Sequence, residues 1–262
     1  LITIAPAYQD HLQLVHDLKL PFIVFAGSFP RRKEIELAKQ VGAKVLCFAS
    51  TESIAKRMID YGADAIVLEG MEAGGHVGHV TLAILLQQVL FRISDVPIFV
   101  AGGIGTGRMA GNLLLMGADG VQLGTRFAVA EESCAHENFK STFIRSKARD
   151  AISTPQIDSR LPVVSVRALR NESTDEFRRL QLDLIEQLDT EHITRHEAQM
   201  KVEEFWIGRL RDAVVDGDVN NGSLMAGQSV GLVEDVMSVD AIMQELVNDA
   251  EKELQAAKRR LQ

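Results

Sequence analysis

A histidine within a glycine-rich segment is the strongest candidate for chemistry in this sequence. His76 belongs to the segment EGMEAGGHVG, which begins at Glu69 directly after an apolar stretch typical of a buried strand. An imidazole exchanges a proton near neutral pH, and flanking glycines allow a large flat ligand to approach the main chain. The segment therefore predicts a ligand-binding turn in which His76 acts as a general base or as a donor that orients the substrate.

A second glycine-rich turn follows the next apolar stretch. That stretch ends in Ala101, Gly102 and Gly103. In a barrel of alternating strands and helices, the loops that follow the strands line the active site. We therefore expect this turn and His76 to face a common ligand.

The elements that would position these turns repeat along the first half of the chain. A helical stretch ends in Gly-Ala and a short apolar run follows, at Gly42-Ala43, Gly62-Ala63 and Gly117-Ala118. Glycine supplies the left-handed residue that ends a helix, and runs rich in Val, Ile and Leu are typical of strands buried on both faces. We predict strands near residues 1–5, 21–26, 44–49, 64–69, 96–101 and 118–124, joined by amphipathic helices such as Ile54–Tyr61 and Arg108–Met116.

This array predicts an α/β fold of the TIM (β/α)8 barrel type. Six strands are too few to close such a barrel, and the chain begins at Leu1, without a methionine and within a predicted strand. We therefore expect a barrel that is N-terminally incomplete in this chain and lacks about two βα units of roughly 30 residues each. A doubly wound open sheet is the alternative architecture.

The pattern along the chain predicts three parts. Residues 1–130 form the partial barrel with its candidate loops, and residues 131–216 form a smaller helical insert or lid domain. Within that insert, 131–152 and 175–215 are helix-prone, whereas 154–169 contains two prolines and predicts a loop. Residues 217–262 comprise a glycine-rich segment and a helix returning to the barrel, Val239–Leu261, whose packing stripe is Ile242, Leu246, Ala250 and Leu254.

Composition excludes several classes of protein. The 262 residues are 46% hydrophobic and 24% charged, which is typical of a globular enzyme rather than a disordered chain. A net charge of −8 without a basic face disfavours nucleic acid as a partner. No apolar run reaches the roughly 18 residues of a membrane span, and the two cysteines favour a reducing compartment. We predict a cytoplasmic protein that binds neither nucleic acid nor membrane.

One motif resembles a nucleotide-binding turn. Gly105–Ala110 matches the dinucleotide pattern G-x-G-x-x-A after a strand. A dinucleotide fold also needs an acidic residue at the end of the next strand, but that strand ends in Gln122–Thr125. We therefore favour a single phosphate at this helix start over a dinucleotide, and a tight turn without a ligand is the third interpretation.

Two other patterns have simpler explanations than chemistry. Gly227–Gly231 matches the nucleophile elbow G-x-S-x-G around Ser229, but a loop-like segment precedes it where an elbow needs a strand. His192 and His196 have the i, i+4 spacing of a helical metal site, yet their charged neighbours favour a solvated surface and no third ligand is evident. We predict no metal site, and His79 is at most a supporting group for His76.

Four segments in this order resemble the FMN-dependent enzymes that include nitronate monooxygenase (2-nitropropane dioxygenase) and enoyl-acyl carrier protein reductase II. They are EGMEAGGHVG, VPIFVAGGIGTG, GADGVQLGTRF and GSLMAGQSVGL. The resemblance implies a TIM barrel with a smaller helical domain, a phosphate of FMN at the loops after the last two strands, and His76 as the catalytic residue. The implied cofactor-binding residues are Glu69, Ala73, Gly74, Gly75, Ala101, Gly102, Gly103, Gln122, Leu123, Gly124 and Thr125, and Met225, Gly227 and Gln228 are implied on the substrate side.

The resemblance covers the chain from its first predicted strand to about Leu232. Family members also carry a glycine-methionine turn on the first strands, which this chain lacks, and an asparagine after the third strand, near which only Leu1–Pro6 is left. If these 262 residues were the whole polypeptide, weak or absent flavin binding would be expected.

The resemblance implies two activities and leaves a third interpretation open. The first hypothesis is a nitronate monooxygenase, which converts an alkyl nitronate and oxygen into a carbonyl compound and nitrite. The second is an enoyl reductase that uses NAD(P)H to reduce an enoyl thioester, against which the acidic composition argues because an acidic carrier protein needs a basic docking patch. The third is a truncated, non-catalytic flavin-binding remnant. A homodimer is compatible with each.

Overall fold

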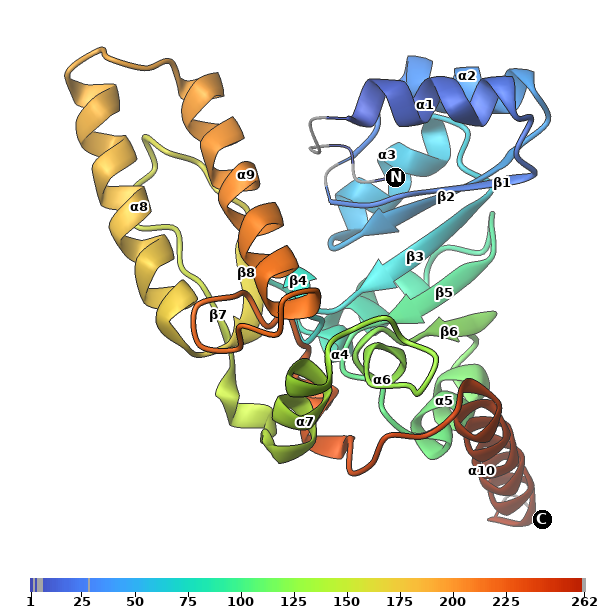
Figure 1. Cartoon of the computed structure of the whole chain (residues 1–262). Coiled ribbons are helices and arrows are strands. Elements are labelled where there is room, and N and C mark those ends of the chain that lie inside the picture. The colour runs from blue at the N-terminus through green and yellow to red at the C-terminus, as the bar shows by residue number, and fades with distance from the viewer. Residues whose placement is uncertain (2, 4–6, 28, 261–262) are drawn as a thin grey trace.

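The computed structural model describes residues 1, 3, 7–27 and 29–260. Its core is a sheet of five parallel strands in the order β1-β2-β3-β5-β6 (Figure 1). The sixth predicted strand, residues 1–5, lies largely outside the described residues. The five strands, each within a predicted one, are β1 (Phe22–Phe25), β2 (Lys44–Ala49), β3 (Ala65–Glu69), β5 (Ile98–Ala101) and β6 (Gly120–Gln122).

The strand order decides between the two predicted architectures. A doubly wound sheet reverses its order at a switch point. Here the parallel strands follow the order of the chain without a reversal, so the doubly wound alternative is wrong and the sheet is of the barrel type. Within the described residues this sheet is open, and β1 and β6 form its edges.

A repeated Gly-Ala-Asp unit sets the start of two strands. Gly62 and Gly117 have positive φ angles of 99° and 105°, which confirms the predicted left-handed residue after each helix. The aspartate of each unit then accepts a hydrogen bond from the neighbouring strand, Asp64 from the Val45 N–H at 2.9 Å and Asp119 from the Ile98 N–H at 2.8 Å. Helix ends and strand starts are therefore fixed by the same three residues.

Helices pack around the sheet and bury its strands. Ile66 and Leu68 of β3, the central strand, are fully buried in the main apolar core. No helix among the described residues combines the length and apolarity needed to cross a membrane. The helices of this part are α1 (Tyr8–Asp17), α2 (Arg32–Gln40), α3 (Glu52–Asp60), α4 (Leu82–Leu85), which continues as the π-helical turn η1 (Leu86–Leu90), and α5 (Gly107–Leu115).

A second, antiparallel sheet was not predicted from the sequence. It consists of β4 (Gly75–His76), β8 (Val166–Leu169) and β7 (Ala151–Ser153), in that order. The expectation of a loop over 154–169 is therefore wrong for its last four residues, which pair with strands on both sides. Pairing between distant segments decides this strand, whereas the local signal comes from prolines earlier in the stretch.

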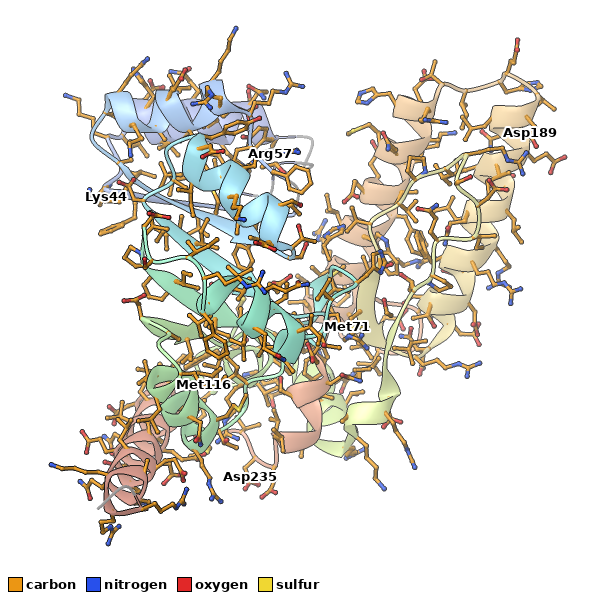
Figure 2. All side chains as sticks on the ribbon, turned by 180° about the vertical axis from the view of Figure 1, so that it is seen from behind. Lys44, Arg57, Met71, Met116, Asp189 and Asp235 are labelled. Atoms are coloured by element: carbon orange, nitrogen blue, oxygen red, sulfur yellow. The ribbon has the colours of Figure 1, made fainter. Side chains whose placement is uncertain are left out.

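A helical hairpin extends away from the barrel-type sheet (Figure 1). In Figure 2, Met71 lies where the two parts of the molecule meet, and Asp189 lies at the far end of the hairpin. Phe177, Leu184 and Trp206 are almost fully buried between the two helices. The hairpin is α8 (Glu172–Asp189) and α9 (Arg195–Val214), and the shorter elements near it are α6 (Thr125–Ala128), α7 (Glu137–Arg145), η2 (Ala148–Asp150) and η3 (Gln228–Leu232).

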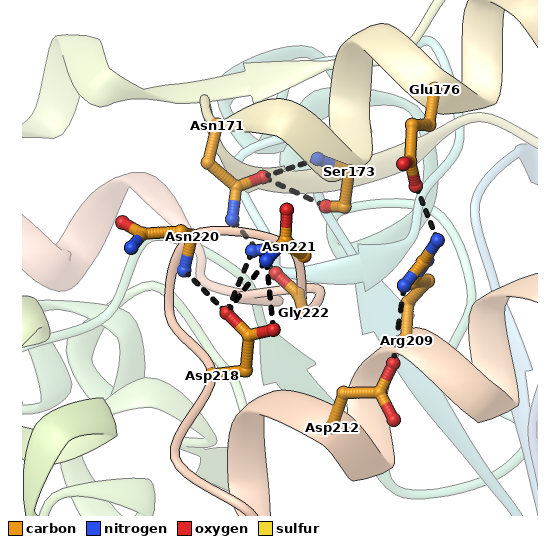
Figure 3. Close-up of polar contacts among 9 residues, drawn as sticks. All are labelled: Asn171, Ser173, Glu176, Arg209, Asp212, Asp218, Asn220, Asn221 and Gly222. Carbon is orange, nitrogen blue, oxygen red and sulfur yellow. Dashed lines mark hydrogen bonds and ion pairs between the residues drawn. The ribbon is translucent and has the colours of Figure 1, made fainter.

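Hydrogen bonds tie the base of the hairpin to the glycine-rich segment that follows it (Figure 3). The Asn171 side chain caps α8 by accepting from the Ser173 N–H at 3.1 Å, and its amide donates to the Gly222 carbonyl at 2.8 Å. Arg209 of α9 pairs with Glu176 of α8 at 2.6 Å. The two helices and the returning chain therefore have a fixed relative position at this end.

The last helix, α10 (Val239–Arg260), packs on α5 beside β6 (Figure 1). Of its predicted stripe, Ile242, Leu246 and Ala250 are buried, whereas Leu254 is only partly buried. Gly107 and Gly111 of α5 face α10 so closely that a Cβ at Gly107 would collide with the Leu246 carbonyl. Gly107 and Gly111 therefore serve the packing of α5 against α10.

The first prediction tests this packing. Gly107→Ala should lower the free energy of unfolding by about 1–3 kcal/mol, because the new methyl group meets main-chain atoms of α10. Gly208→Ala is the matched control. Gly208 lies within α9, and no atom lies within 4 Å of the point that its Cβ would occupy, so alanine there should stabilise the helix by about 0.5–1 kcal/mol. Urea unfolding measures both, and equal effects of the two substitutions would contradict the assignment.

Candidate active site

The ends of three neighbouring strands bring the predicted turns together. Glu69 at the end of β3 pairs with Ala101 at the end of β5, and Ala101 pairs with Gln122 at the end of β6. Because the strands are parallel, the chain leaves all three residues at the same edge of the sheet. The glycine-rich turns that follow them therefore form one surface.

The main chains of these turns approach each other too closely for side chains. A Cβ at Gly74 would lie 2.5 Å from the Gly227 nitrogen, and one at Gly102 would lie 2.8 Å from the Gly70 carbonyl oxygen. The Gln228 N–H also donates to the Glu72 carbonyl at 2.9 Å. Glycine is required here by contact between backbone segments, in addition to any approach of a ligand.

A cavity of about 370 Å³ lies over these turns, and we call it the glycine-rich cavity. Its volume is within the range of roughly 300–1,000 Å³ typical of small-molecule sites. Met225 and Gly227 line it, as do three residues that the sequence did not single out for this role, Ile104, Ala128 and Ser229. The rest of its lining is the complete predicted cofactor set, namely Glu69, Ala73, Gly74, Gly75, Ala101, Gly102, Gly103, Gln122, Leu123, Gly124 and Thr125.

A second cavity, of about 480 Å³, contains the candidate histidine, and we call it the histidine cavity. His76 and His79 line it together with apolar side chains that include Phe48 and Val164. It shares four lining residues with the glycine-rich cavity, so a ligand in one lies directly beside a ligand in the other. The shared residues are Glu69, Gly74, Gly75 and Met225.

His76 is held by strand pairing and faces a carboxylate from the hairpin. It pairs with Val166 of β8, and the next residue, Val77, donates its N–H to the Ser165 carbonyl at 2.9 Å. Its Nε2 lies 3.3 Å from Oε2 of Glu203 in α9. That distance is within ion-pair range, although the contact does not meet hydrogen-bond geometry. Glu203 was not singled out by the sequence, because one glutamate in a polar helix carries no distinguishing signal.

Glu69 lies where the two cavities meet. Burial raises the pKa of its carboxyl to about 8, because the surrounding protein stabilises a negative charge less well than water does. A side chain with this pKa is largely protonated at neutral pH and is able to donate a hydrogen bond to a ligand. The sequence predicts Glu69 at the border of the cofactor, but it does not indicate that the pKa of this carboxyl is raised.

Several sequence expectations are corrected at this site. Gln228 lines neither cavity. Thr106 caps α5 by accepting from the Met109 N–H, and the glycine-rich cavity reaches only to Ile104, so this cavity does not extend to the helix start at which a phosphate was predicted. At Ser229 the structure agrees with the sequence: this residue lies in the turn η3, no strand directly precedes it, and no nucleophile elbow is formed.

The paired histidines of the hairpin also differ from expectation. His192 precedes α9, in the turn after α8, and contacts Thr190 at 2.7 Å, whereas His196 lies within α9. The two are therefore not on one helix face. Within the described part of the chain, no cluster of three or more His, Cys, Asp or Glu side chains is arranged to hold a metal ion.

Comparison with known proteins identifies the family. The nitronate monooxygenase family model matches residues 2–249. The chain belongs to the nitronate monooxygenase family. Members of this family are flavin-dependent oxidoreductases that act on small molecules.

Relatives within this family act on different substrates according to their names. An octahydro-indene carboxyl-CoA dehydrogenase of Mycobacterium tuberculosis is 28% identical and aligns with 87% of this chain and 71% of its own length. A probable nitronate monooxygenase of Staphylococcus aureus is 29% identical and aligns with 68% of this chain and 51% of its own. This chain thus spans about half of the latter protein.

Solved structures give the same fold. FabK from Thermotoga maritima superposes with a TM-score of 0.84 at 31% identity, over 99% of this chain and 77% of that one. A nitroalkane oxidase from Streptomyces ansochromogenes gives a TM-score of 0.74 at 25% identity, over 95% and 70%. Both are TIM barrels, which confirms the predicted fold class of this family member.

The second prediction concerns the buried carboxyl of Glu69. Its folded pKa of about 8 exceeds the ordinary value of 4.5, so the unfolded chain ionises first and the free energy of unfolding falls as pH rises from about 4.5 to about 8. Glu69→Gln should remove this fall, which is on the order of 5 kcal/mol, since the two pKa values differ by about 3.5 units and each unit corresponds to about 1.4 kcal/mol.

Urea unfolding of the flavin-free protein at a series of pH values measures this effect. Glu36→Gln is the matched control, because Glu36 is exposed on α2 and its substitution should leave the pH profile unchanged. Parallel pH profiles for wild type and Glu69→Gln would contradict the raised pKa.

Proposed function

We propose that this protein is an FMN-dependent nitronate monooxygenase, which converts an alkyl nitronate and oxygen into a carbonyl compound and nitrite. One observation carries the proposal. The histidine cavity, with His76 in its wall, adjoins the glycine-rich cavity, and the two share Glu69, Gly74, Gly75 and Met225 in their lining. A substrate beside His76 would therefore contact a flat cofactor over the glycine-rich turns.

The residues of the glycine-rich cavity fit FMN. Gly102 and Gly103 both have positive φ, and the space where a side chain of Gly124 would point is empty to 4 Å. We assign the phosphate to the loops Gly102–Gly103 and Gly124–Thr125, and the isoalloxazine edge to Glu69 and Ala73–Gly75, with Met225 covering it. When bound, the flavin supplies the electron acceptor for the nitronate.

In this proposal His76 handles the substrate proton. A neutral nitroalkane carries an acidic C–H beside the nitro group, and an imidazole removes such a proton when it lies within hydrogen-bond reach. A preformed nitronate has already lost this proton, so the same ring holds the anion and moves no proton. The apolar walls of the histidine cavity, among them Phe48 and Val164, would accept the alkyl part and exclude water from it.

A second candidate function is an NAD(P)H-dependent enoyl-thioester reductase. Two observations favour it: alignments with the CoA dehydrogenase and FabK cover 71% and 77% of those proteins, against 51% of the probable nitronate monooxygenase. The histidine cavity, at about 480 Å³, also offers more space than a small nitronate requires. Its substrate would be an enoyl thioester.

The third prediction separates these two functions. Flavin-reconstituted protein is mixed anaerobically with a small alkyl nitronate or, separately, with NADH, and flavin absorbance is followed by stopped flow. We expect bleaching by the nitronate alone and recovery on admission of oxygen. Rapid bleaching by NADH alone would instead support the thioester reductase. Flavin that binds but is bleached by neither compound would contradict both functions and leave the interpretation of a non-catalytic flavin-binding remnant. Failure to bind flavin would contradict all three interpretations.

The fourth prediction tests the role of His76. His76→Ala should lower kcat/KM for a neutral nitroalkane by about 100-fold or more, because a general base is lost. Oxidation of the preformed nitronate should fall much less, since its proton is already absent. Flavin affinity should not change, because His76 does not line the glycine-rich cavity.

His79→Ala is the matched control for this experiment. His79 lines the same cavity as His76 but is not held opposite a carboxylate in the described structure. We expect its substitution to preserve the ratio of nitroalkane to nitronate turnover. If His76→Ala loses activity toward the nitroalkane and the nitronate equally, His76 is not the general base.

A further inference from the structure

We propose that Glu203 is a positioning residue for His76, and that it makes Nδ1 the ring atom that receives the substrate proton. The inference rests on the proposed function of His76 and adds to it a residue from the hairpin. It assigns a positioning role to a part of the chain that the sequence predicts only as a helical insert or lid domain.

The surroundings of the imidazole distinguish its two nitrogens. Nε2 is fully enclosed, and Oε2 of Glu203 at 3.3 Å is the polar atom facing it. Nδ1 is not enclosed, and it forms no hydrogen bond with any described residue. Because His76 lines the histidine cavity, the open nitrogen is the one that a substrate in that cavity reaches.

The chemistry of the pair then fixes where the proton lies. At 3.3 Å the negative charge of an ionised carboxylate attracts the positive end of an N–H and repels a nitrogen lone pair, so the neutral ring is stabilised with its hydrogen on Nε2 and its lone pair on Nδ1. When Nδ1 takes a proton, the ring becomes positive and the nearby carboxylate stabilises that charge. The side chains of His76 and Glu203 are only 17% and 14% exposed, so water screens this interaction weakly.

The hairpin places Glu203 through its apolar core. Ala198, Val202 and Trp206 form the buried stripe of α9, and Glu203 lies at the edge of that stripe. Val166 belongs to the same core and is the strand partner of His76. Packing of one cluster therefore sets the positions of both members of the pair.

The base of the hairpin keeps this arrangement in register. Arg209, six residues after Glu203 on α9, pairs with Glu176 of α8, and Asn171 binds the segment that leads to Met225 (Figure 3). Ion pairs between partly exposed side chains contribute little stability. We therefore expect Arg209 to fix the position of α9 relative to α8 rather than to add much to the free energy of unfolding. Met225 in the wall of the histidine cavity and the carboxylate of Glu203 thus belong to one structural unit.

The test is the tautomer of His76, measured by long-range proton–nitrogen NMR on the protein as purified. We expect the form with hydrogen on Nε2 to dominate in the wild type. In Glu203→Gln, whose amide both donates and accepts, the form with hydrogen on Nδ1 should increase several-fold. Glu204→Gln removes the same charge one residue along, from an exposed position, and should leave the tautomer unchanged.

Turnover provides the second readout. Glu203→Gln should slow proton removal from a neutral nitroalkane by about tenfold or more, while oxidation of the preformed nitronate changes little. An unchanged tautomer, or proton removal at the wild-type rate, overturns the proposal. If the protein oxidises no nitronate at all, the proposed function fails, and the tautomer alone decides the role of Glu203.

Circular dichroism establishes that each variant is folded before either readout. If Glu203→Gln does not fold, Glu203→Asp takes its place, because its carboxylate is retained but withdrawn by one methylene. For Glu203→Asp we expect smaller changes in the tautomer and in the rate of proton removal, in the same directions as for Glu203→Gln. A Glu203→Asp variant that behaves like the wild type overturns the proposal.

Discussion

The close approach of glycine main chains at the edge of the parallel sheet is the constraint on which the site depends. Gly74 meets the Ala226–Gly227 backbone, and Gly102 meets the backbone of Gly70. A side chain at either position would separate segments that are far apart in the sequence. The floor of the glycine-rich cavity is therefore made of backbone, whose shape is set by the strand register and does not depend on rotamers.

The sheet and the hairpin contribute different things to the site. The sheet supplies the turns after β3, β5 and β6, which meet because Glu69, Ala101 and Gln122 are neighbours in register. The far side is supplied by β8, the strand shortly before the hairpin, which pairs with the strand that contains His76, and by Glu203 of the hairpin itself. The site consequently requires the second sheet as well as the first, although β4 has only two residues.

The sequence predicted those features of the fold and of the site that depend on a local signal. The Gly-Ala repeats indicated the strand starts, because a left-handed glycine must follow each helix, and the glycine-rich turns indicated the lining of the cavity. Features that depend on distant segments were missed. β8 exists because β4 and β7 pair with it, Gly107 and Gly111 are explained by α10, and Glu203 is placed by a core that only the folded hairpin creates. The boundaries of the three predicted parts stay a prediction.

One cavity is formed mostly by backbone and the other by side chains. This difference bears on why family membership identifies a cofactor better than a substrate. The glycine-rich cavity presents mostly main chain and small residues, so its shape depends little on side-chain conformation. The histidine cavity is lined by side chains from the first turns and from the segment before β8, among them Phe48 and Val164. Those side chains can change without disturbing the glycine contacts. We therefore expect substrate choice to depend on the insert and on the side chains around His76.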